Sequence, residues 1–215
     1  MLPSCKVQEV LGMAEGLLCY VRLDDADAVR FETAGRPVSE LDELRIVDDL
    51  DRDVPPGEVG ELVARGPYTI RGYFRAEEHN RTAFTPDGYY RTGDLIRMHP
   101  SANVIVAGRR KDLINRAGEK ISAEEVENLI MGHRAVVNVA CVPIPDAVLG
   151  ERMCACVITR SGTSLTLDEL TAFLLGKGIA RFKLPERLEV FDEFPMTRVG
   201  KVSKRDLVEL VTRVG

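Results

Sequence analysis

Aromatic residues are scarce in this 215-residue chain, and tryptophan is missing altogether. Phe, Tyr and Trp make up only 6% of the sequence, whereas proteins that bind single-stranded nucleic acids stack the bases on aromatic side chains within basic grooves. The formal net charge is −5, so the chain also lacks the excess of positive charge that phosphate backbones attract. We therefore expect no nucleic acid among its partners.

Patterns typical of metal sites and membrane segments are missing too. The five cysteines are odd in number, no two have Cys-X-X-Cys spacing, and only three histidines are present, so no zinc site is indicated. No stretch approaches the roughly 18 apolar residues needed to cross a bilayer, and the N-terminus does not read as a secretory signal. We expect reduced thiols, a cytoplasmic location and no membrane partner.

The chain has enough apolar residues to fold, with 45% hydrophobic residues and a mean hydropathy of −0.08. Its charge is uneven. Residues 1–108 carry 12 basic and 19 acidic side chains, a net charge of −7, whereas residues 109–215 carry 17 and 15, a net charge of +2. This difference predicts two small domains with a boundary near residue 109, and the weakly basic second part suits a small anionic ligand.

The first part has the pattern of antiparallel β-structure. Turn signals such as "VPPGE" and "TPDGYY" separate its strand-like runs. These runs are "DELRIVD" (42–48), "GEVGELVARG" (57–66), "YTIRGYF" (68–74) and "ANVIVAG" (102–108).

The second part alternates helices and strands, as a small α/β domain does. Three pairs of a Ser or Thr with an acidic residue three positions later predict helix starts. The pairs are Ser122 with Glu125, Thr166 with Glu169 and Ser203 with Asp206. Strands are expected over residues 135–144, 152–160 and 187–194.

The stretch "GRRKDLINRAGEKIS", residues 108–122, joins the two parts and is rich in charge. Arg109 offers a fork of donors suited to phosphate or ribose oxygens. Residues 115–120 are expected to form a loop, in which Ala117 and Gly118 would let a ligand approach the backbone closely. A solvated basic turn fits the spacing about equally well.

Two further residues are candidates for binding or catalysis. Asp94 follows a Thr-Gly turn in "YRTGDL", so its carboxylate would project from a loop and accept hydrogen bonds from a diol. Lys201 follows Gly200 just before a predicted helix and would bring a mobile charge to an anionic centre. An ordinary turn aspartate and an exposed loop lysine are the alternatives.

Taken together, four stretches resemble the successive core motifs of the adenylate-forming superfamily, which contains acyl-CoA synthetases, nonribosomal-peptide adenylation domains and luciferases. The stretches are "GMAEG" (12–16), "YRTGDL" (90–95), "GRRKDLINRAGEKIS" (108–122) and "TRVGKVSK" (197–204). They occur in the order and at the spacings of that superfamily. The resemblance spans essentially the whole chain and is more specific than any one motif.

Longer stretches are similar to the aryl-acid AMP ligases that activate 2,3-dihydroxybenzoate or salicylate for siderophore assembly. They are "GMAEGLLCYVRLDD", "RGPYTIRGYF", "NRAGEKISAEEVENLI" and "GIARFKLPERLE". The resemblance implies two half-reactions, in which the acid first reacts with ATP and Mg²⁺ to give an aryl adenylate. The acyl group then passes to the phosphopantetheine thiol of an aryl carrier protein.

Residue roles follow from the resemblance by position. It implies that Glu15 helps to hold Mg²⁺, that Asp94 binds the ribose hydroxyls and that Arg109 contacts ribose or phosphate. Lys201 matches the catalytic lysine of adenylation, and Lys111, in the segment 109–112, matches the hinge between the half-reactions. Other positions matched are Gly12, Met13 and Ala14 beside adenine and the aryl ring, and Asn115, Ala117, Gly118, Glu119 and Lys120 in the loop of the thioester conformation.

The departures from the family pattern concern the nucleotide. Leu11 stands where the family usually has an aromatic residue, which would weaken stacking on adenine. No glycine-rich phosphate loop ending in Pro-Lys occurs in the sequence, and most of the acyl pocket is missing. The chain matches roughly the last two-fifths of such an enzyme, and "LPSCKVQEV" (2–10) reads as an interior strand. It would be a fragment, a split-gene subunit or a decayed relative, with a separate or missing N-terminal portion.

The expected fold is therefore α+β. Residues 1–108 would form the β-rich C-terminal part of a large adenylation domain, and residues 109–215 a small α/β lid. Three alternatives stay open: another acid–thiol ligase of the superfamily that activates a fatty or amino acid, a noncatalytic subunit that docks a carrier protein, and a plain α/β domain whose motifs coincide by chance.

The missing phosphate loop leads to a first prediction. Such a loop supplies backbone N–H donors and a lysine to the β- and γ-phosphates. Pyrophosphate exchange with 2,3-dihydroxybenzoate or salicylate should stay at background for this chain alone and appear once the N-terminal portion is supplied. Robust exchange by the purified 215-residue chain would contradict this reading.

Overall fold

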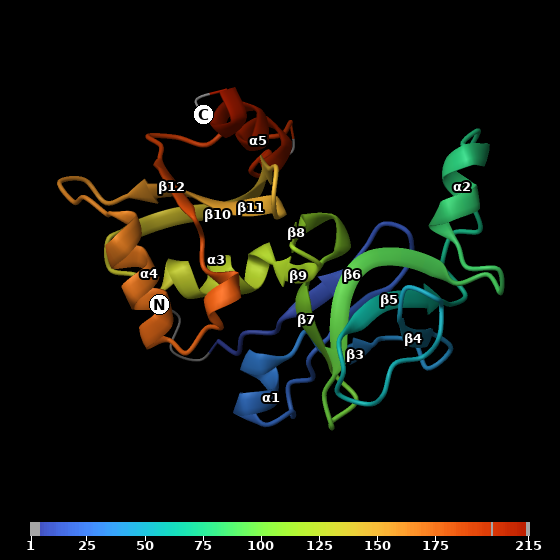
Figure 1. The fold of residues 1–215 in the computed structure, drawn as a ribbon. Coiled ribbons are helices and arrows are strands. Elements are labelled where there is room, and N and C mark those ends of the chain that lie inside the picture. The colour runs from blue at the N-terminus through green and yellow to red at the C-terminus, as the bar shows by residue number, and fades with distance from the viewer. Residues whose placement is uncertain (1–4, 199, 214–215) are drawn as a thin grey trace. The chain divides into compact units, whose positions relative to one another are not determined.

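The computed structural model describes residues 5–198 and 200–213, and the chain divides into two compact units, Met1–Arg110 and Lys111–Gly215. The boundary expected from the sequence, between residues 108 and 109, lies two residues earlier. Each unit combines mainly antiparallel sheet with a few helices (Figure 1). The expected α+β class is confirmed. Within the described residues, no helix has the length and apolar character needed to cross a bilayer.

The first unit contains two antiparallel sheets in which strands adjacent in sequence are also adjacent in space. The small sheet has strands β1 (Val10–Gly12), β2 (Leu18–Tyr20) and β3 (Arg36–Pro37), and the larger one β4 (Glu43–Val47), β5 (Gly60–Arg65), β6 (Tyr90–Met98) and β7 (Val104–Arg109). Cys19 from the small sheet and Leu62, Ile96 and Val104 from the larger one belong to one buried cluster. Both sheets therefore share a core.

Two short helices of this unit are not predicted by the sequence. Helices α1 (Asp27–Glu32) and α2 (Glu77–Ala83) have six and seven residues, too few for a helical hydrophobic pattern to stand out. Their N-cap positions hold Ala26 and Ala76, and neither makes a side-chain capping hydrogen bond. Neither a hydrophobic pattern nor a capping side chain therefore predicts these two helices.

The strand expected over residues 68–74 is wrong, because this segment forms turns against the "GMAEG" stretch. The Ile70 amide donates to the Glu15 carbonyl at 2.8 Å. A Cβ added to Gly16 would lie 2.5 Å from backbone atoms of Tyr68 and Thr69, so the two segments are in close contact. In the stretch 2–10 only Val10 lies in a strand, residues 5–9 do not, and residues 2–4 fall outside the described residues.

The second unit is built on one five-stranded sheet in the order β10-β11-β8-β9, with β12 also paired to β11. Its strands are β8 (Leu113–Arg116), β9 (Glu119–Ser122), β10 (Val136–Asp146), β11 (Gly150–Thr159) and β12 (Arg187–Val190). Strand β10 is at an edge of this order and contains Pro143, opposite Met153, and Pro145, opposite Glu151.

In the described part of the second unit, three α-helices accompany the sheet, and all three begin where the sequence predicts. They are α3 (Ala123–Met131), α4 (Leu167–Gly176) and α5 (Lys204–Arg213). The hydroxyl of each N-terminal Ser or Thr accepts the amide three residues later, and at Thr166 the reciprocal bond from Glu169 completes the capping box. Helices α3 and α4 share one core with one face of the sheet, and α5 shares another core with the other face (Figure 1).

The loop expected over residues 115–120 is instead the end of a tight hairpin. Strand β8 pairs with β9, Asn115 lies opposite Lys120, and Arg116 lies opposite Glu119. Only Ala117 and Gly118 form the turn, with φ angles of +50° and +91°. Positive φ at both positions is the type I′ geometry that matches the twist of a hairpin. An Ala-Gly pair is a weaker sequence signal for this turn than Asn-Gly, which explains the wrong prediction.

The burial of the cysteines yields a second prediction. Cys5 is exposed, whereas the other four thiols are buried, and burial raises the pKa of Cys19 to about 12. Because the thiolate is the reactive form, a disulfide reagent should titrate one thiol rapidly in the native chain and five in denaturant. A Cys5→Ser variant should lose the fast phase. Rapid reaction of a second thiol would contradict the buried positions.

Candidate active site

The "GMAEG" stretch forms the turn of the hairpin between β1 and β2. Gly12 ends β1, and the Met13 amide donates to the Leu17 carbonyl at 3.0 Å. The side chain of Leu11 packs against the core of the unit. A pocket beside this turn is lined by Gly12, Met13, Ala14, Gly16, Leu17 and Leu18, together with Tyr68 from the facing segment.

The carboxylate of Glu15 is linked to strand β6 through two tyrosines. The Tyr73 hydroxyl donates to Glu15 Oε1 at 2.8 Å and lies 3.0 Å from the Tyr90 hydroxyl. Burial raises the pKa of Tyr73, and its hydrogen bonds with Tyr90 and Glu15 raise it further. Tyr73 therefore remains a protonated donor that orients Glu15. The sequence gives no sign of this role, because Tyr73 falls in the segment that was expected to be a strand.

The sequence predicts that Asp94 projects from a loop, but in the structure this residue lies within strand β6. The register between β5 and β6 shifts here, Gly93 has a φ of +70°, and the Thr92 hydroxyl donates to the Leu62 carbonyl at 2.9 Å. The Asp94 amide in turn donates to that hydroxyl at 3.0 Å. A glycine in the left-handed region permits the bulge that re-aims the strand at this point.

The Asp94 side chain is 5% exposed and faces a cation on the neighbouring strand. Arg109 lies directly opposite on β7, and its Nε is 2.8 Å from Asp94 Oδ1. The arginine side chain is 48% exposed, so the pair is buried at the carboxylate and open at the guanidinium. Two of the residues selected from the sequence are thus brought into direct contact. The remaining Arg109 donors can reach an oxygen-rich ligand.

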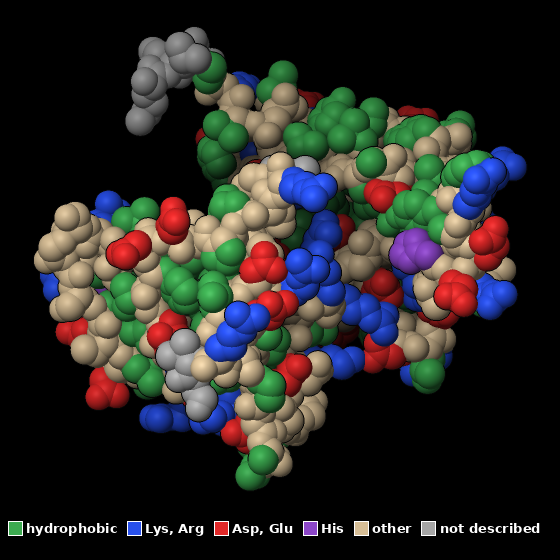
Figure 2. All heavy atoms as spheres, turned by 90° about the horizontal axis from the view of Figure 1, so that it is seen from above, with side chains coloured by type: hydrophobic (Ala, Val, Ile, Leu, Met, Phe, Trp, Pro, Cys, Tyr) green, Lys and Arg blue, Asp and Glu red, His purple; other side chains and the backbone are tan. Residues whose placement is uncertain are grey.

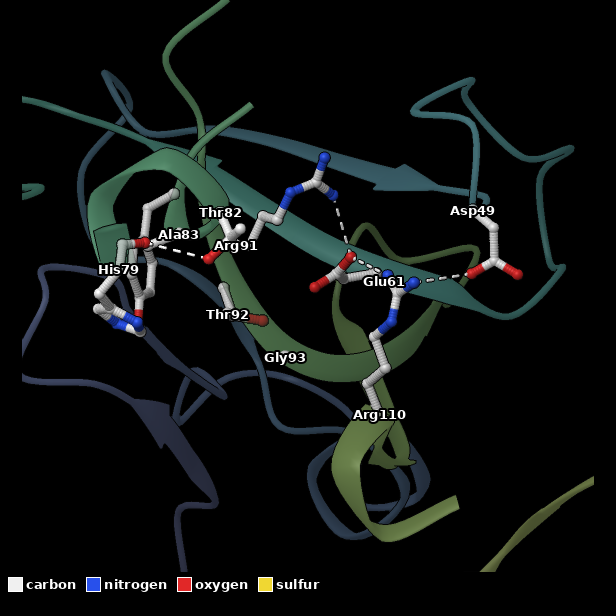
Figure 3. Close-up of a pocket in the computed structure, with 10 residues that line it drawn as sticks. Asp49, Glu61, His79, Thr82, Ala83, Arg91, Thr92, Gly93 and Arg110 are labelled. Atoms are coloured by element: carbon white, nitrogen blue, oxygen red, sulfur yellow. Dashed lines mark hydrogen bonds and ion pairs between the residues drawn. The ribbon is translucent and has the colours of Figure 1, made fainter. Parts of the chain in front are cut away.

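A second group of charges surrounds a neighbouring cavity of about 410 Å³ (Figure 3). Its centre is Glu61 on β5, which is 5% exposed and accepts from Arg91 at 3.2 Å and from Arg110 at 2.6 Å. Figure 3 shows both arginine side chains turned toward Glu61, and Asp49 on the outer side of Arg110. Asp51 holds Arg91 at 2.6 Å.

This network gives a structural role to Arg110, the second of the three consecutive basic residues 109–111. Two guanidinium groups face three carboxylates, so the cavity offers little positive charge to an anion. Arg110 therefore ties the end of the first unit to β5. Figure 2 likewise shows basic and acidic side chains interspersed over the visible face. The sequence analysis did not select Glu61. The feature that could have indicated it is an acidic residue within a mostly apolar strand.

Lys201 lies in a tight turn of the second unit. Met196 and Val202 form an isolated bridge, and between them Thr197 donates its amide to the Lys201 carbonyl at 2.7 Å. Gly200 has a φ of +77°, and the Lys201 side chain is exposed. Residue 199 of this motif lies outside the described residues. The turn ends at Ser203, which caps helix α5.

The other residues selected from the sequence lie at or near the start of the second unit. Lys111 is exposed and occupies the middle of a 3₁₀ turn, Arg110–Asp112. The hairpin residues Ala117, Gly118, Glu119 and Lys120 are exposed as well, as is Asn115. Among the described residues, no group of three or more His, Cys, Asp or Glu side chains could hold a metal ion. A single carboxylate such as that of Glu15 is compatible with Mg²⁺ binding, because Mg²⁺ takes one or two protein carboxylates and completes its coordination shell with phosphates and water.

Comparison with known families defines the class of this fold and site. Residues 1–74 match the AMP-binding enzymes, and residues 125–201 match the AMP-binding enzyme C-terminal domain. Together these segments cover more than half of the chain. The chain therefore belongs to the AMP-binding, or adenylate-forming, enzymes, as the resemblance of its motifs predicted.

Its relatives include enzymes that activate aryl acids. It is 58% identical over 205 residues to a salicylyl-CoA synthase / salicylate adenylyltransferase from Streptomyces sp, and 52% identical over 209 residues to the 2,3-dihydroxybenzoate-AMP ligase of Bacillus subtilis (strain 168). These alignments cover 95% and 97% of this chain, but 37% and 39% of the relatives. The chain spans about two-fifths of the length of the curated relatives it matches.

Solved structures of the family have the same fold. ATP-bound MatB from Rhodopseudomonas palustris matches with a TM-score of 0.87 and 28% identity, over 97% of this chain and 41% of that one. The o-succinylbenzoate CoA synthetase of Bacillus subtilis, in complex with its acyl-adenylate intermediate, matches with a TM-score of 0.81 and 26% identity, over 93% and 40%.

Proposed function

We propose that this chain is part of an aryl-acid AMP ligase that activates 2,3-dihydroxybenzoate or salicylate in siderophore or nonribosomal peptide synthesis. The observation that carries the proposal is the identity above 50%, over nearly all of the chain, to enzymes named for these two acids. In the first half-reaction, a carboxylate oxygen of the acid attacks the α-phosphorus of ATP and pyrophosphate leaves. In the second, the thiol of an aryl carrier protein attacks the acyl carbon and AMP leaves.

The geometry of the first unit suits the nucleotide side of this reaction. Asp94 would accept the ribose hydroxyls, and Arg109 would hold that carboxylate in place while offering its other donors to ribose or phosphate oxygens. Glu15, oriented by Tyr73, would contribute one oxygen to Mg²⁺, which would neutralise phosphate charge when bound. Gly12, Met13 and Ala14 would border adenine and the aryl ring.

The second unit would act as the lid that serves each half-reaction in turn. Lys201, on an exposed and sharply turned segment, would bridge the acid carboxylate and ATP oxygens during adenylation. Rotation about Lys111 would then present the hairpin 113–122 to the carrier protein's phosphopantetheine arm. The N-terminal portion with the phosphate loop would complete the site, and the buried reduced thiols suit a cytoplasmic location.

A second candidate is a related acid–thiol ligase with a different acid. A relative 51% identical over 204 residues is the 2-hydroxy-7-methoxy-5-methyl-1-naphthoate–CoA ligase of Streptomyces carzinostaticus, which uses a larger ring system and a different thiol. Pyrophosphate exchange on the completed enzyme, tested with aryl, fatty and amino acids, separates these possibilities. A noncatalytic, carrier-docking subunit would give no exchange with any acid.

The proposed role of Lys201 leads to a third prediction. In a complete enzyme that contains this segment, Lys201→Ala should slow adenylate formation by about two to three orders of magnitude, the effect of removing a preorganised contact to transition-state charge. Thioester formation from supplied aryl adenylate should persist. Lys177→Ala, which alters an exposed lysine of the same unit, is the control. An equal loss in both half-reactions would rule out this role.

The proposed hinge leads to a fourth prediction. Proline at position 111 fixes φ near −65° and should obstruct rotation between the two states. Adenylation by Lys111→Pro should persist while acyl transfer to the carrier protein collapses. Lys111→Ala removes the same charge but leaves φ free, so it separates charge from rotation. If Lys111→Pro performs both steps at the rate of the unaltered enzyme, position 111 is not the hinge.

A further inference from the structure

Strand β11 has an outer edge that two strands share, one after the other. Along its whole length β11 pairs with β10, so β8 and β12 must both use the opposite edge. Strand β8 meets this edge only at the pair Gly150 and Arg116, whereas β12 pairs with residues 154–157. Residues 151–153 lie between the two strands, and their outward backbone groups need other partners.

Glu186, the residue just before β12, fills this gap. Its backbone amide donates to the Met153 carbonyl at 3.0 Å, and its Oε2 accepts the Met153 amide at 3.0 Å. Its other oxygen, Oε1, accepts from Arg116 Nε. One carboxylate therefore joins the backbone of β11 to the last residue of β8. Arg116 and Glu186 are 27% and 23% exposed, so water screens this ion pair only in part.

Two more hydrogen bonds connect β8 and the turn that follows it to the hairpin formed by β10 and β11. Glu151 Oε2 accepts the Asn115 amide at 2.7 Å, and the Leu149 carbonyl accepts the Ala117 amide at 2.7 Å. The Leu149 carbonyl is itself placed by Asp146, whose Oδ1 accepts the amides of Val148 and Leu149. The carboxylates of Glu151 and Glu186 thus connect β8 to β11 where the two strands do not pair.

We propose that Glu186, acting through Arg116, is a positioning residue that fixes the direction of the Ala117–Gly118 turn. The hairpin has four residue pairs, and a two-stranded hairpin of this length is marginally stable by itself. Ile114 and Ile121 anchor the base of the hairpin in the core, whereas the direction of its exposed turn depends on the attachment to β11. This role rests on the proposed function in one respect, namely that the exposed turn serves the acyl-transfer half-reaction.

Hydrogen exchange on the 215-residue chain tests the attachment without any activity. Glu186→Gln keeps the side chain's size but removes its charge, and Arg116→Gln removes the other partner. In both variants the amides of Asn115 and Ala117 should exchange roughly tenfold faster, as expected when a locally opening segment loses a charge-assisted hydrogen bond. Amides of α3 and β10 should keep their rates. Glu193→Gln, on an exposed glutamate of the same unit, is the matched control.

Three outcomes would overturn the proposal. They are unchanged exchange at the hairpin in both variants, faster exchange throughout the second unit, and faster exchange in Glu186→Gln but not in Arg116→Gln, which would exclude the path through Arg116. In the completed ligase, Glu186→Gln should slow acyl transfer several-fold and leave adenylation unchanged. If the unaltered ligase forms no adenylate at all, the proposed function fails, whereas the exchange experiment still decides the role of Glu186.

Discussion

The charge of Asp94 is the constraint on which the first unit depends. Burying a carboxylate whose side chain is only 5% exposed is costly unless a cation and hydrogen-bond donors compensate its charge. Arg109 supplies the cation from the opposite strand position, which requires β7 to continue to the end of the unit. The bulge at Gly93 aims the carboxylate, and the hydroxyl of Thr92 holds the bulge. The position of the Asp94 carboxylate is therefore set by interactions within the first unit.

Elements with strong local signals could be predicted from the sequence. The hydroxyl caps at Ser122, Thr166 and Ser203 fix the starts of three helices, because a side-chain oxygen at this position satisfies an otherwise unpaired amide. The long apolar runs of β10 and β11 were equally clear. Helices α1 and α2, which lack such caps, were not predicted. The segment 68–74 forms turns beside the Glu15 turn, to which the Ile70 amide bonds, and not a strand.

In the candidate site, too, features with a local sequence signal could be predicted and features that depend on distant segments could not. Motifs identified Glu15, Asp94, Arg109 and Lys201 as single residues, since each stands in a recognisable local pattern. Their supporting partners come from segments distant in sequence, as when Tyr73 reaches Glu15 over 58 positions. Neither secondary-structure propensity nor hydrophobic periodicity indicates which distant side chains will be in contact. Whether Asp94 projects from a loop or lies buried in a strand also depends on its cross-strand partner, so the sequence alone favoured the loop.

The two prolines of β10 bear on the behaviour of the chain in concentrated solution. Pro143 lies opposite Met153, whose backbone groups bond to Glu186 and so point away from β10. The nitrogen of Pro143, and that of Pro145 two residues on, must then face the open side of the edge strand, where a proline breaks no bond within the sheet. An incoming strand from another molecule would find no N–H donor at either position. The sheet is thereby guarded against growth into intermolecular β-aggregates at its longest exposed strand.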